Sequence, residues 1–335
     1  MISHLLDLTK IFCYIVFMTE KNRSLPANAP TEYKVDNAVI LAAGFGSRFT
    51  PISLCKPKGL VKIGGVPLVE RQILHLLQKG ICDITLITGY MAEAFFYLKD
   101  KYGVKFIFNP DHAVKNNLSS LYFARKELKN TYILSSDNYM SENIYSPTET
   151  LSWYSCAYAS EYTNEWCLDL DDDNRITSVH VGGKNSWYMY GSVFFNRDFS
   201  DKMVPLLEKY YPLPEWADKY WEDILIAHAN DLPIYAKKFS ENIVYEFESL
   251  DELRAFDRST TEDEENPYIA EIAELLAVPV KKIREFSPVA SAAAYPGAFR
   301  FSVENKRFVA LPANHEDMPA NPLAQGRLLN VYPCE

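Results

Sequence analysis

The feature that most constrains the fold is an alternation of short apolar runs with longer amphipathic segments between residues 36 and 256. Runs typical of strands lie at 38–42, 84–88, 104–108 and 131–135, and patterns typical of helices lie at 67–79, 91–102 and 118–128. Strands that alternate with helices predict parallel βαβ units. We therefore expect an α/β fold with a doubly wound, mostly parallel sheet of the Rossmann-like kind. Ligands bind outside the carboxyl ends of the strands in such sheets.

The first of these runs leads directly into a glycine-rich turn. Residues 38–62 read AVILAAGFGSRFTPISLCKPKGLVK. Gly44 and Gly46 let the backbone turn sharply and bring its N–H groups toward an anion. Arg48 adds a fixed fork of donors and Lys58 adds a mobile charge. The segment therefore predicts a polyphosphate-binding site at the end of a strand.

Competing interpretations of this turn differ in the residues that they require. A dinucleotide-binding fingerprint needs a third glycine where Phe49 stands, and a Walker loop needs a Gly-Lys-Ser/Thr run that the chain lacks. A Gly-x-Gly pair alone is as compatible with a structural turn as with a binding loop. The later Pro57-Lys58 pair favours the binding loop.

Composition excludes several classes of partner. The chain has 335 residues, of which 48% are hydrophobic, and these can bury a sizeable core. The net charge of −10 argues against nucleic acid or an anionic membrane as a partner. The six cysteines form no C-x-x-C pair, which favours a reduced, cytoplasmic protein over a zinc-binding or disulfide-rich one. A homo-oligomer is compatible with this composition.

A second chemical feature is the acidic residue that follows the predicted strand 131–135. Asp137 and Asn138 come at the carboxyl end of this run. A carboxylate in this position can hold Mg²⁺ against phosphate oxygens, because Mg²⁺ favours one or two carboxylates plus phosphates and water. An Asp-Asn pair can also shape a turn or cap a helix. The combination with the glycine loop favours the metal ligand.

Two further carboxylates alternate with aromatic residues in the run Val244–Glu248. The alternation predicts that Glu246 and Glu248 share one face of a strand. Two carboxylates on one face repel each other unless a cation lies near them. We interpret Glu248 as the partner of Asp137 at the metal and Glu246 as facing a cationic substrate. The alternative is a solvated strand face.

The motif G-x-G-S-R…P-K-G-L resembles the MobA-like nucleotidyltransferases, which activate sugar phosphates and phosphoalcohols with a nucleoside triphosphate. Over residues 36–257 the chain is similar to the bacterial CTP:phosphocholine cytidylyltransferases. The residues that carry this likeness are Asn116–Leu121, Ser136–Tyr139, Asn164–Trp166, Tyr220–Glu222 and Tyr245–Glu248. Some members read His-Lys-Ser where this chain reads Lys-Pro-Lys-Gly, and Asp is frequent at the position of Glu248.

This resemblance implies a role for each matching residue. Arg48 and Lys58 would be catalytic, Asp137 and Glu248 would hold the cofactor Mg²⁺, and the choline head group would lie among Trp166, Trp221 and Glu246. The nucleotide would bind to Leu41, Ala42, Ala43, Gly44, Phe45, Gly46, Ser47, Arg48, Asn117 and Ser119, of which Asn117 and Ser119 are candidates for reading the cytosine edge. Aromatic faces and a carboxylate suit a quaternary ammonium, which has no N–H to donate.

The implied reaction is transfer of CMP from CTP to phosphocholine. The acceptor phosphate would attack the α-phosphorus in line and expel pyrophosphate, without a general base. A 2-aminoethylphosphonate cytidylyltransferase is the nearest alternative, since a primary amine would prefer carboxylates such as Glu246. A sugar-1-phosphate nucleotidyltransferase and a non-catalytic regulator are further alternatives.

The ends of the chain suggest four parts. We expect a flexible lead-in at 1–35, in which Met18 is the true start or residues 1–17 form a loose amphipathic arm. The nucleotidyltransferase domain then covers 36–257, an acidic linker 258–266, and a small α+β domain 267–335. In the last part, 267–278 is predicted to be helical and 299–311 to form a hairpin. It resembles the start of a choline-kinase-like domain, whose nucleotide loop is represented only by 290–297.

Overall fold

The computed structural model describes residues 31–240, 242–289, 297–312 and 328–334, which divide into two compact units. Unit 1 comprises residues up to Gly44 together with Val69–Glu246, and unit 2 comprises Phe45–Leu68 together with the residues from Phe247 onward. These units do not follow the domain boundaries expected at 257 and 267, because the second half of the glycine loop groups with the C-terminal segment.

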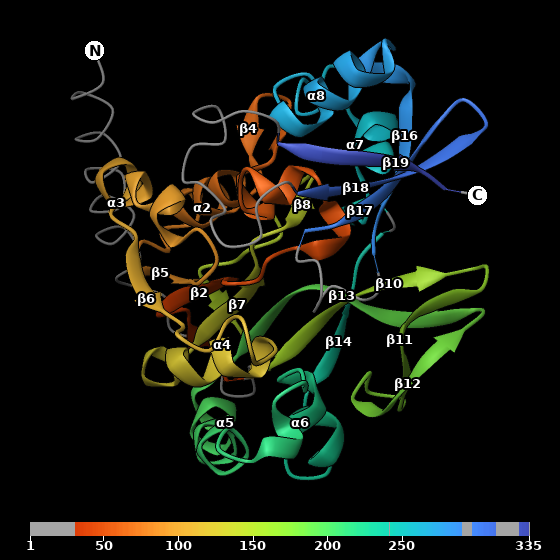
Figure 1. Ribbon diagram of the computed structural model, residues 1–335. Coiled ribbons are helices and arrows are strands. Elements are labelled where there is room, and N and C mark those ends of the chain that lie inside the picture. Colours follow the sequence, from red (N-terminus) through yellow and green to blue (C-terminus); the bar gives the residue numbers. More distant parts are fainter. Residues whose placement is uncertain (1–30, 241, 290–296, 313–327, 335) are drawn as a thin grey trace. The chain divides into compact units, whose positions relative to one another are not determined.

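Unit 1 is organised around a mixed sheet, which has nine strands in the described part of the chain (Figure 1). Its parallel section has the order β7-β2-β5-β6. These strands are β2 (Asn37–Ala42), β5 (Ile84–Thr88), β6 (Lys105–Phe108) and β7 (Thr131–Ser135), which confirms the four predicted strands. Since β2 precedes β5 and β6 in the chain while β7 follows them, the order of the strands reverses between β2 and β7.

The other strands of this sheet extend it mainly in the antiparallel sense. Next to β7 lies β13, which also pairs with β10 and β11. These strands are β10 (Trp153–Ala159), β11 (Thr163–Leu170), β12 (Ile176–Gly183), β13 (Ser186–Phe195) and β14 (Tyr235–Lys238). Two small ladders accompany the sheet, one formed by β1 (Tyr33–Lys34) with β9 (Thr148–Glu149) and one by β8 (Asn138–Met140) with β15 (Val244–Glu246).

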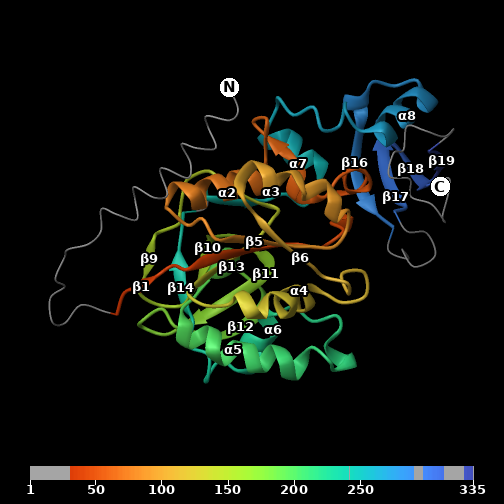
Figure 2. The ribbon, with the colours of Figure 1, turned by 90° about the vertical axis from the view of Figure 1, so that its left-hand side faces the viewer.

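Helices cover both faces of this sheet (Figure 2). On one face lie α2 (Leu68–Gln78) and α3 (Tyr97–Tyr102), and on the other lie α4 (Asn117–Ala124), α5 (Arg197–Tyr210) and α6 (Glu222–Ala227). The predicted helix 67–79 is confirmed by α2, whose buried side chains include Leu68, Ile73 and Leu76. The doubly wound α/β architecture is thereby confirmed.

Two predicted helices are shorter than expected. The segment 91–102 begins with the 3-10 turn η4 (Ala92–Phe95) before α3, because Met91 adopts a left-handed φ of 47°. The segment 118–128 ends in the 3-10 turn η5 (Arg125–Glu127) after α4. Both corrections concern the ends of elements and leave the order of strands and helices unchanged.

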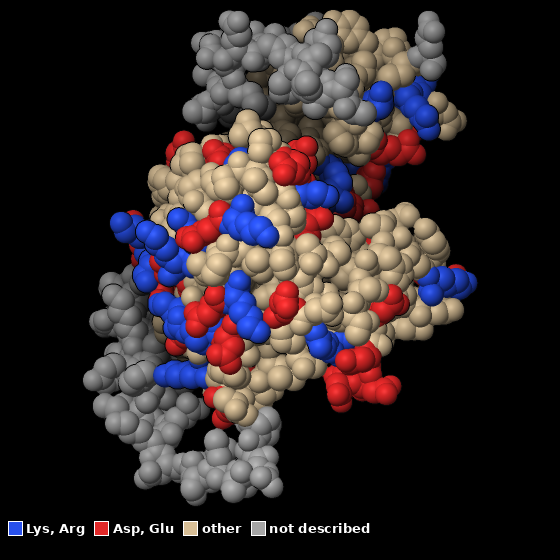
Figure 3. Space-filling model, turned by 90° about the horizontal axis from the view of Figure 1, so that it is seen from below, with Lys and Arg blue, Asp and Glu red and all other residues tan. Residues whose placement is uncertain are grey.

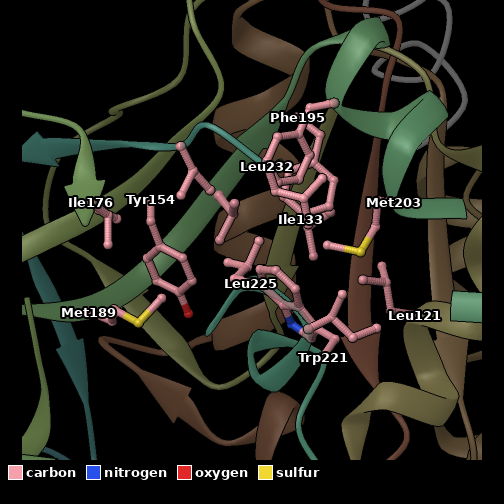
Figure 4. Close-up of a cluster of buried hydrophobic side chains, with 14 of the residues drawn as sticks. Leu121, Ile133, Tyr154, Ile176, Met189, Phe195, Met203, Trp221, Leu225 and Leu232 are labelled. Atoms are coloured by element: carbon pink, nitrogen blue, oxygen red, sulfur yellow. The ribbon is translucent and has the colours of Figure 1, made fainter. Parts of the chain in front are cut away.

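The main core of unit 1 lies between the sheet and the helices α4, α5 and α6 (Figure 4). Its buried members include Leu121, Ile133, Tyr154, Phe195, Met203, Trp221 and Leu225. Two helices that border this core begin at an asparagine whose side chain accepts a backbone N–H, Asn116 for α4 and Asn196 for α5. These caps satisfy backbone donors that the first helical turn leaves free.

Unit 2 combines the segment after the glycine loop with the C-terminal elements. The early segment contains the 3-10 turns η1 (Ser47–Phe49), η2 (Ile52–Leu54) and η3 (Lys58–Leu60), then the hairpin β3 (Lys62–Ile63) and β4 (Val66–Pro67). The later elements are α7 (Leu250–Phe256), α8 (Pro267–Leu276), the turn η7 (Val280–Lys282) and the antiparallel sheet β16 (Ile283–Pro288), β17 (Phe299–Val303), β18 (Lys306–Pro312) and β19 (Leu329–Pro333). The predicted helix 267–278 and the predicted hairpin 299–311 are confirmed.

The expected linker 258–266 is a packed part of unit 2. Glu262, Asp263 and Asn266 are buried within it. The acidic composition predicts a linker, whereas Glu262 and Asp263 form ion pairs with Lys56 and Arg254 of unit 2. At the N-terminus, Tyr33–Lys34 belongs to a strand and Val35 is buried, so the lead-in does not extend to residue 35. Its residues 1–30, and the predicted loop 290–296, lie outside the described residues.

The surface carries charges of both signs. On the face shown in Figure 3, acidic and basic side chains are interspersed among uncharged ones. None of the helices in the described part of the chain has both the length and the apolar character needed to cross a membrane.

Candidate active site

The site in unit 1 begins where the strand order reverses. The carboxyl ends of β2 and β7 lie side by side there, with Leu41 paired to Ser135, and the N–H of Ser136 donates to the Leu41 carbonyl at 3.0 Å. The strands thus lead into Ala43-Gly44 and into Asp137, which is half-buried. Open parallel sheets bind ligands at this kind of position. The structure therefore brings the start of the glycine loop and Asp137 to one edge of the sheet, as predicted.

A buried glutamine in α2 holds the turn that carries Asp137. The Nε2 atom of Gln72 donates to the carbonyl oxygens of Ser135 at 2.8 Å and Asn138 at 2.9 Å. On the other side, Asn138 pairs with Glu246 across the ladder between β8 and β15. Glu246 and Asp137 therefore occupy neighbouring positions, and Gln72 fixes the backbone beneath them. Sequence patterns did not single out Gln72, because its role depends on the packing of α2.

The glycine loop continues into unit 2, where Gly46 packs against the catalytic lysine candidate. Gly46 has a φ of +67°, which favours glycine, and a Cβ added to it would lie 3.3 Å from the Lys58 Cβ. The Lys58 side chain is buried, with its Nζ 5.9 Å from the centroid of the Phe49 ring. Gly46 therefore packs closely against the aliphatic part of the Lys58 side chain. This contact restricts the direction of that side chain.

Arg48 and Glu248, also in unit 2, form an ion pair. Glu248 lies beyond the end of β15, so the expectation that it shares a strand face with Glu246 is wrong. It precedes Ser249, which caps α7, and its N–H donates to Glu252 at 2.9 Å. These contacts fix the backbone of Glu248, while 37% of its side chain stays accessible. The Arg48 guanidinium can bind a phosphate group, and the Glu248 carboxylate can bind a cation.

Unit 1 holds the aromatic and acidic residues expected around a cationic head group, in two sets of contacts. The rings of Trp166 and Tyr220 meet edge to face with centroids 5.6 Å apart, and Tyr220 is 45% exposed. Burial raises the pKa of Tyr190, and the charges of Glu246 and Glu165 add to this rise. The Tyr190 hydroxyl accepts the N–H of Glu246. Aromatic faces such as those of Trp166 and Tyr220, and carboxylates such as Glu246, are groups that attract a cation.

The structure corrects the prediction for Trp221. This residue is 2% exposed and packs in the core, where its ring stacks on Tyr154 and meets Phe195 edge to face (Figure 4). Packing therefore accounts for Trp221, and its neighbour Tyr220 is the aromatic residue of this motif that reaches the surface. The two stand side by side in the sequence, and only the packing shows which ring turns outward.

Asn117 and Ser119, which the resemblance predicts to contact the cytosine edge, form hydrogen bonds within unit 1. Ser119 is fully buried, and its hydroxyl donates to the Asn116 carbonyl at 2.8 Å and accepts from Asn109. The Asn117 Oδ1 atom accepts the N–H of Trp221 at 2.9 Å. We correct the assignment of Ser119, because no part of it is accessible to a base. The side chain of Asn117 links α4 to α6.

Glu222 is a buried acid that the sequence analysis did not assign. Its Oε1 accepts from the Tyr154 hydroxyl at 3.1 Å, and its Oε2 has no hydrogen-bond partner among the described residues. Removal from water raises the pKa of Glu222 to about 7, although hydrogen bonds from its own backbone, Tyr154 and Asn117 oppose this rise. Glu222 therefore changes charge near neutral pH.

The chemistry of the acidic side chains suits magnesium. Among the described residues no group of three or more His, Cys, Asp or Glu side chains clusters as a metal site. Mg²⁺ takes one or two carboxylates and completes its octahedron with phosphate oxygens and water. Asp137 offers one such carboxylate in unit 1, and Glu248 offers one in unit 2.

Comparison with known proteins places these features in a family. The model of the MobA-like NTP transferase domain matches residues 38–137. Choline-phosphate cytidylyltransferase of Streptococcus pneumoniae is 38% identical over 217 residues, which are 65% of this chain and 95% of that protein. The chain belongs to the choline-phosphate cytidylyltransferase family. It is accordingly a nucleotidyltransferase.

Two further comparisons bear on this family. The 2-aminoethylphosphonate cytidylyltransferase of Lancefieldella rimae is 31% identical over 225 residues, 66% of this chain and 92% of that protein. The structure of the CTP:phosphocholine cytidylyltransferase from Streptococcus pneumoniae has a TM-score of 0.64 and 37% identity, and it covers 66% of this chain and 97% of that chain. A thymidylyltransferase structure from Bacillus anthracis, with 17% identity and a TM-score of 0.55, shares the fold.

Proposed function

We propose that the protein transfers CMP from CTP to phosphocholine and produces CDP-choline and pyrophosphate. The observation that carries this proposal is the edge-to-face pair of Trp166 and Tyr220 in the unit that also holds Glu246. Aromatic faces and a carboxylate attract a quaternary ammonium without needing an N–H donor. The 38% identity with a choline-phosphate cytidylyltransferase supports the same acceptor.

The mechanism follows from where the chain places charge. The backbone N–H groups of the glycine loop and the Arg48 guanidinium would bind the β- and γ-phosphates, and Lys58 would neutralise charge at the reacting phosphorus. Asp137 and Glu248 would hold Mg²⁺, which supplies charge neutralisation between the phosphates. Since a phosphate dianion is already a nucleophile, the residues need only align it and the triphosphate.

Binding of the nucleotide requires an exchange of partners. Arg48 and Glu248 neutralise each other in the ion pair described above. We propose that the triphosphate takes over Arg48 while the cation takes over Glu248. The ion pair thus keeps the Arg48 guanidinium and the Glu248 carboxylate close to where they would bind the ligands. Its loss costs little free energy, because each group gains a new partner of opposite charge.

2-Aminoethylphosphonate is the second candidate acceptor. The 31% identity with the Lancefieldella rimae enzyme favours it, and a primary ammonium can donate to carboxylates such as Glu246 and Glu165. The cytoplasmic location and the homo-oligomer stay predictions from the sequence, as does the likeness of the C-terminal segment to a choline kinase.

The experiment that tests the function is pyrophosphate release from the purified protein with Mg²⁺ and CTP. Phosphocholine, 2-aminoethylphosphonate and glucose-1-phosphate would be compared as acceptors at equal concentration. We expect turnover with phosphocholine. A preference for the phosphonate would overturn the choline assignment while keeping the nucleotide chemistry. The variant Tyr220→Leu should raise KM for phosphocholine and leave KM for CTP unchanged.

A further inference from the structure

The nucleotide loop of unit 2 is held by residues from the other end of the chain. We use the name brace for residues Asp257–Asn266, which contain the predicted linker 258–266. The brace contacts the loop segment 51–64, in the middle of which lies Lys58. Each contact described below joins residues of unit 2.

The first anchor of the brace is Glu262, which is 3% exposed. Its Oε2 accepts from Lys56 Nζ at 2.7 Å, and its Oε1 accepts from the Lys62 N–H at 3.0 Å. One carboxylate thus binds the chain on both sides of η3, the turn that carries Lys58. Because both oxygens are used and both are buried, the position of this turn depends on Glu262.

The second anchor is Asn266. Its Nδ2 donates to the Pro51 carbonyl at 3.3 Å and lies 3.5 Å from Cys55 Sγ. Its Oδ1 accepts the N–H groups of Tyr268 and Ile269 and so caps α8. A single amide therefore connects the start of a C-terminal helix with the loop between η1 and η2. At a third point, Asp257 accepts the Gly64 N–H at 2.8 Å.

Other C-terminal elements hold the brace and the turn that carries Arg48. The strand β16 lies against η1, and the Arg254 guanidinium of α7 binds Asp263 at 2.8 Å and the Ile283 carbonyl of β16 at 2.8 Å. Arg254 is itself nearly buried. Arg254 therefore holds the brace against α7 and β16. This keeps Glu262 and Asn266 in position to bind the loop segment.

The brace follows the family motifs in the sequence. The family motifs run from Ala38 to Glu248, and the match to the Streptococcus pneumoniae enzyme covers 217 residues and 95% of that protein. That enzyme is thus much shorter than 335 residues. Glu262 and Asn266 thus belong to the segment that comes after the family motifs.

We propose that Glu262 and Asn266 are positioning residues for the CTP site, and that the C-terminal segment is an integral part of that site. This rests on the proposed function only in assigning the glycine loop to CTP. Both residues act through the loop, on the placement of Lys58 and Arg48. Small displacements of groups that bind a transferring phosphoryl group have large effects on rate, so loosening the loop should weaken nucleotide binding and slow the reaction.

The first test is Glu262→Gln in the full chain. The amide can still accept from the Lys62 N–H, but it loses the charge that holds Lys56. Isothermal titration with Mg²⁺ and CTP, without acceptor, should show a dissociation constant raised about tenfold, because a hydrogen bond to a charged group is lost. In the turnover assay KM for CTP should rise in parallel, while KM for the acceptor stays within about twofold of its value.

The second test is Asn266→Asp, which separates the two roles of this side chain. The aspartate keeps the oxygen that caps α8 but replaces the donor to Pro51 by a second acceptor. The buried acceptor beside the Pro51 carbonyl will lower the melting temperature, so CTP binding is measured where circular dichroism shows the variant to be folded, and we expect it to be weaker there. The matched control is Glu304→Gln, which removes an exposed ion pair with Lys282 in the same unit and should leave CTP binding unchanged.

The outcomes separate the brace from the proposed function. If the wild-type protein binds no CTP, the proposed function fails. If the wild type binds CTP and both variants bind it equally well, the positioning role is overturned while the function stands. Variants that lose melting temperature but bind CTP normally, or that raise KM for both substrates alike, would also overturn it, because they would show a general structural role.

Discussion

Single carboxylates of unit 1 differ in how far they are removed from water. Asp137 is half-buried at the end of β7, whereas Glu222 is 9% exposed and leaves one oxygen without a partner among the described residues. An accessible acid at a strand end can exchange its partners for a metal and phosphate. A buried acid beside aromatic rings instead responds to pH.

The prediction for Asp137 concerns the metal. Asp137→Asn keeps the size of the side chain and removes its charge, so pyrophosphate release should fall at least about a hundredfold because the metal ligand is weakened. The melting temperature should stay within a few degrees of the wild-type value. Turnover close to that of the wild type would contradict the role of Asp137 as a metal ligand.

The prediction for Glu222 concerns stability as a function of pH. Its pKa is raised from 4.5 to about 7, chiefly by burial. Between these values the unfolded chain has lost the proton that the folded protein keeps, so stability falls as pH rises from about 4.5 to about 7 and is level above that. The loss amounts to about 3 kcal/mol.

Urea unfolding at pH 5 and pH 8 would measure this effect. Glu222→Gln cannot ionise, so the difference in unfolding free energy between the two pH values should shrink relative to the wild type. An undiminished pH dependence in the variant would assign the effect to other groups.

The prediction for Gly46 concerns the loop. In Gly46→Ala the new Cβ would meet the Lys58 stem at 3.3 Å in a backbone with positive φ. We expect a loss of about 1 kcal/mol in stability and a lower kcat/KM for CTP, because Lys58 must move. Gly65→Ala is the control, since Gly65 also has positive φ but a Cβ there would meet nothing within 4 Å. Equal losses of kcat/KM in both variants would contradict this account.

At the scale of elements, α2 is a support for the site. Gln72 ties this helix to the turn that carries Asp137. Gln72→Leu should lower kcat about tenfold or more, since it frees that turn and leaves two buried carbonyl groups without their donor. Gln78→Leu at the exposed end of the same helix should leave kcat unchanged. A pyrophosphate assay with both variants decides this, and equal kcat values would refute the support by α2.

Elements defined by local patterns could be predicted from the sequence, whereas contacts between distant residues could not. The strands β2, β5, β6 and β7 and the helix α2 have apolar periodicities that a short window contains. The acidic, polar composition of 258–266 predicts a linker, whereas in the structure Lys56 and Arg254 compensate charges of this segment. Lys56 is 206 residues away from Glu262. No window around residue 262 contains that information.

The site shows the same division. The place of Asp137 just after a strand could be predicted because a strand pattern precedes it, and its role as a metal ligand stays a prediction. Which of the adjacent residues Tyr220 and Trp221 is exposed could not be predicted. The contacts of the Trp221 ring with Tyr154 and Phe195 bury it, and these contacts depend on packing. Gln72 and Glu222 were missed because their roles depend on which groups surround them in three dimensions.

At the scale of the whole molecule, the division into units predicts the effect of shortening the chain. A chain that ends at residue 257 lacks Glu262, Asn266 and β16, so segment 45–68 loses the contacts that these make with it, although Glu248 and Asp257 remain. We expect it to lose CTP binding while the sheet of unit 1, whose strands are all retained, still gives a folded circular dichroism spectrum. Calorimetry and titration would check this. Full CTP affinity in the shortened chain would contradict the prediction.

The separation of 206 residues between Lys56 and Glu262 also has a consequence during synthesis. A ribosome adds about 5–20 residues per second, so the loop emerges roughly 10–40 seconds before the carboxylate that anchors it. A nascent chain can form the strands of unit 1 in that interval. It lacks the contacts of Glu262 and Asn266 that we propose to position the nucleotide loop. Prematurely terminated copies would therefore not sequester CTP, and the capacity to bind it would mark the chains that were translated through the brace.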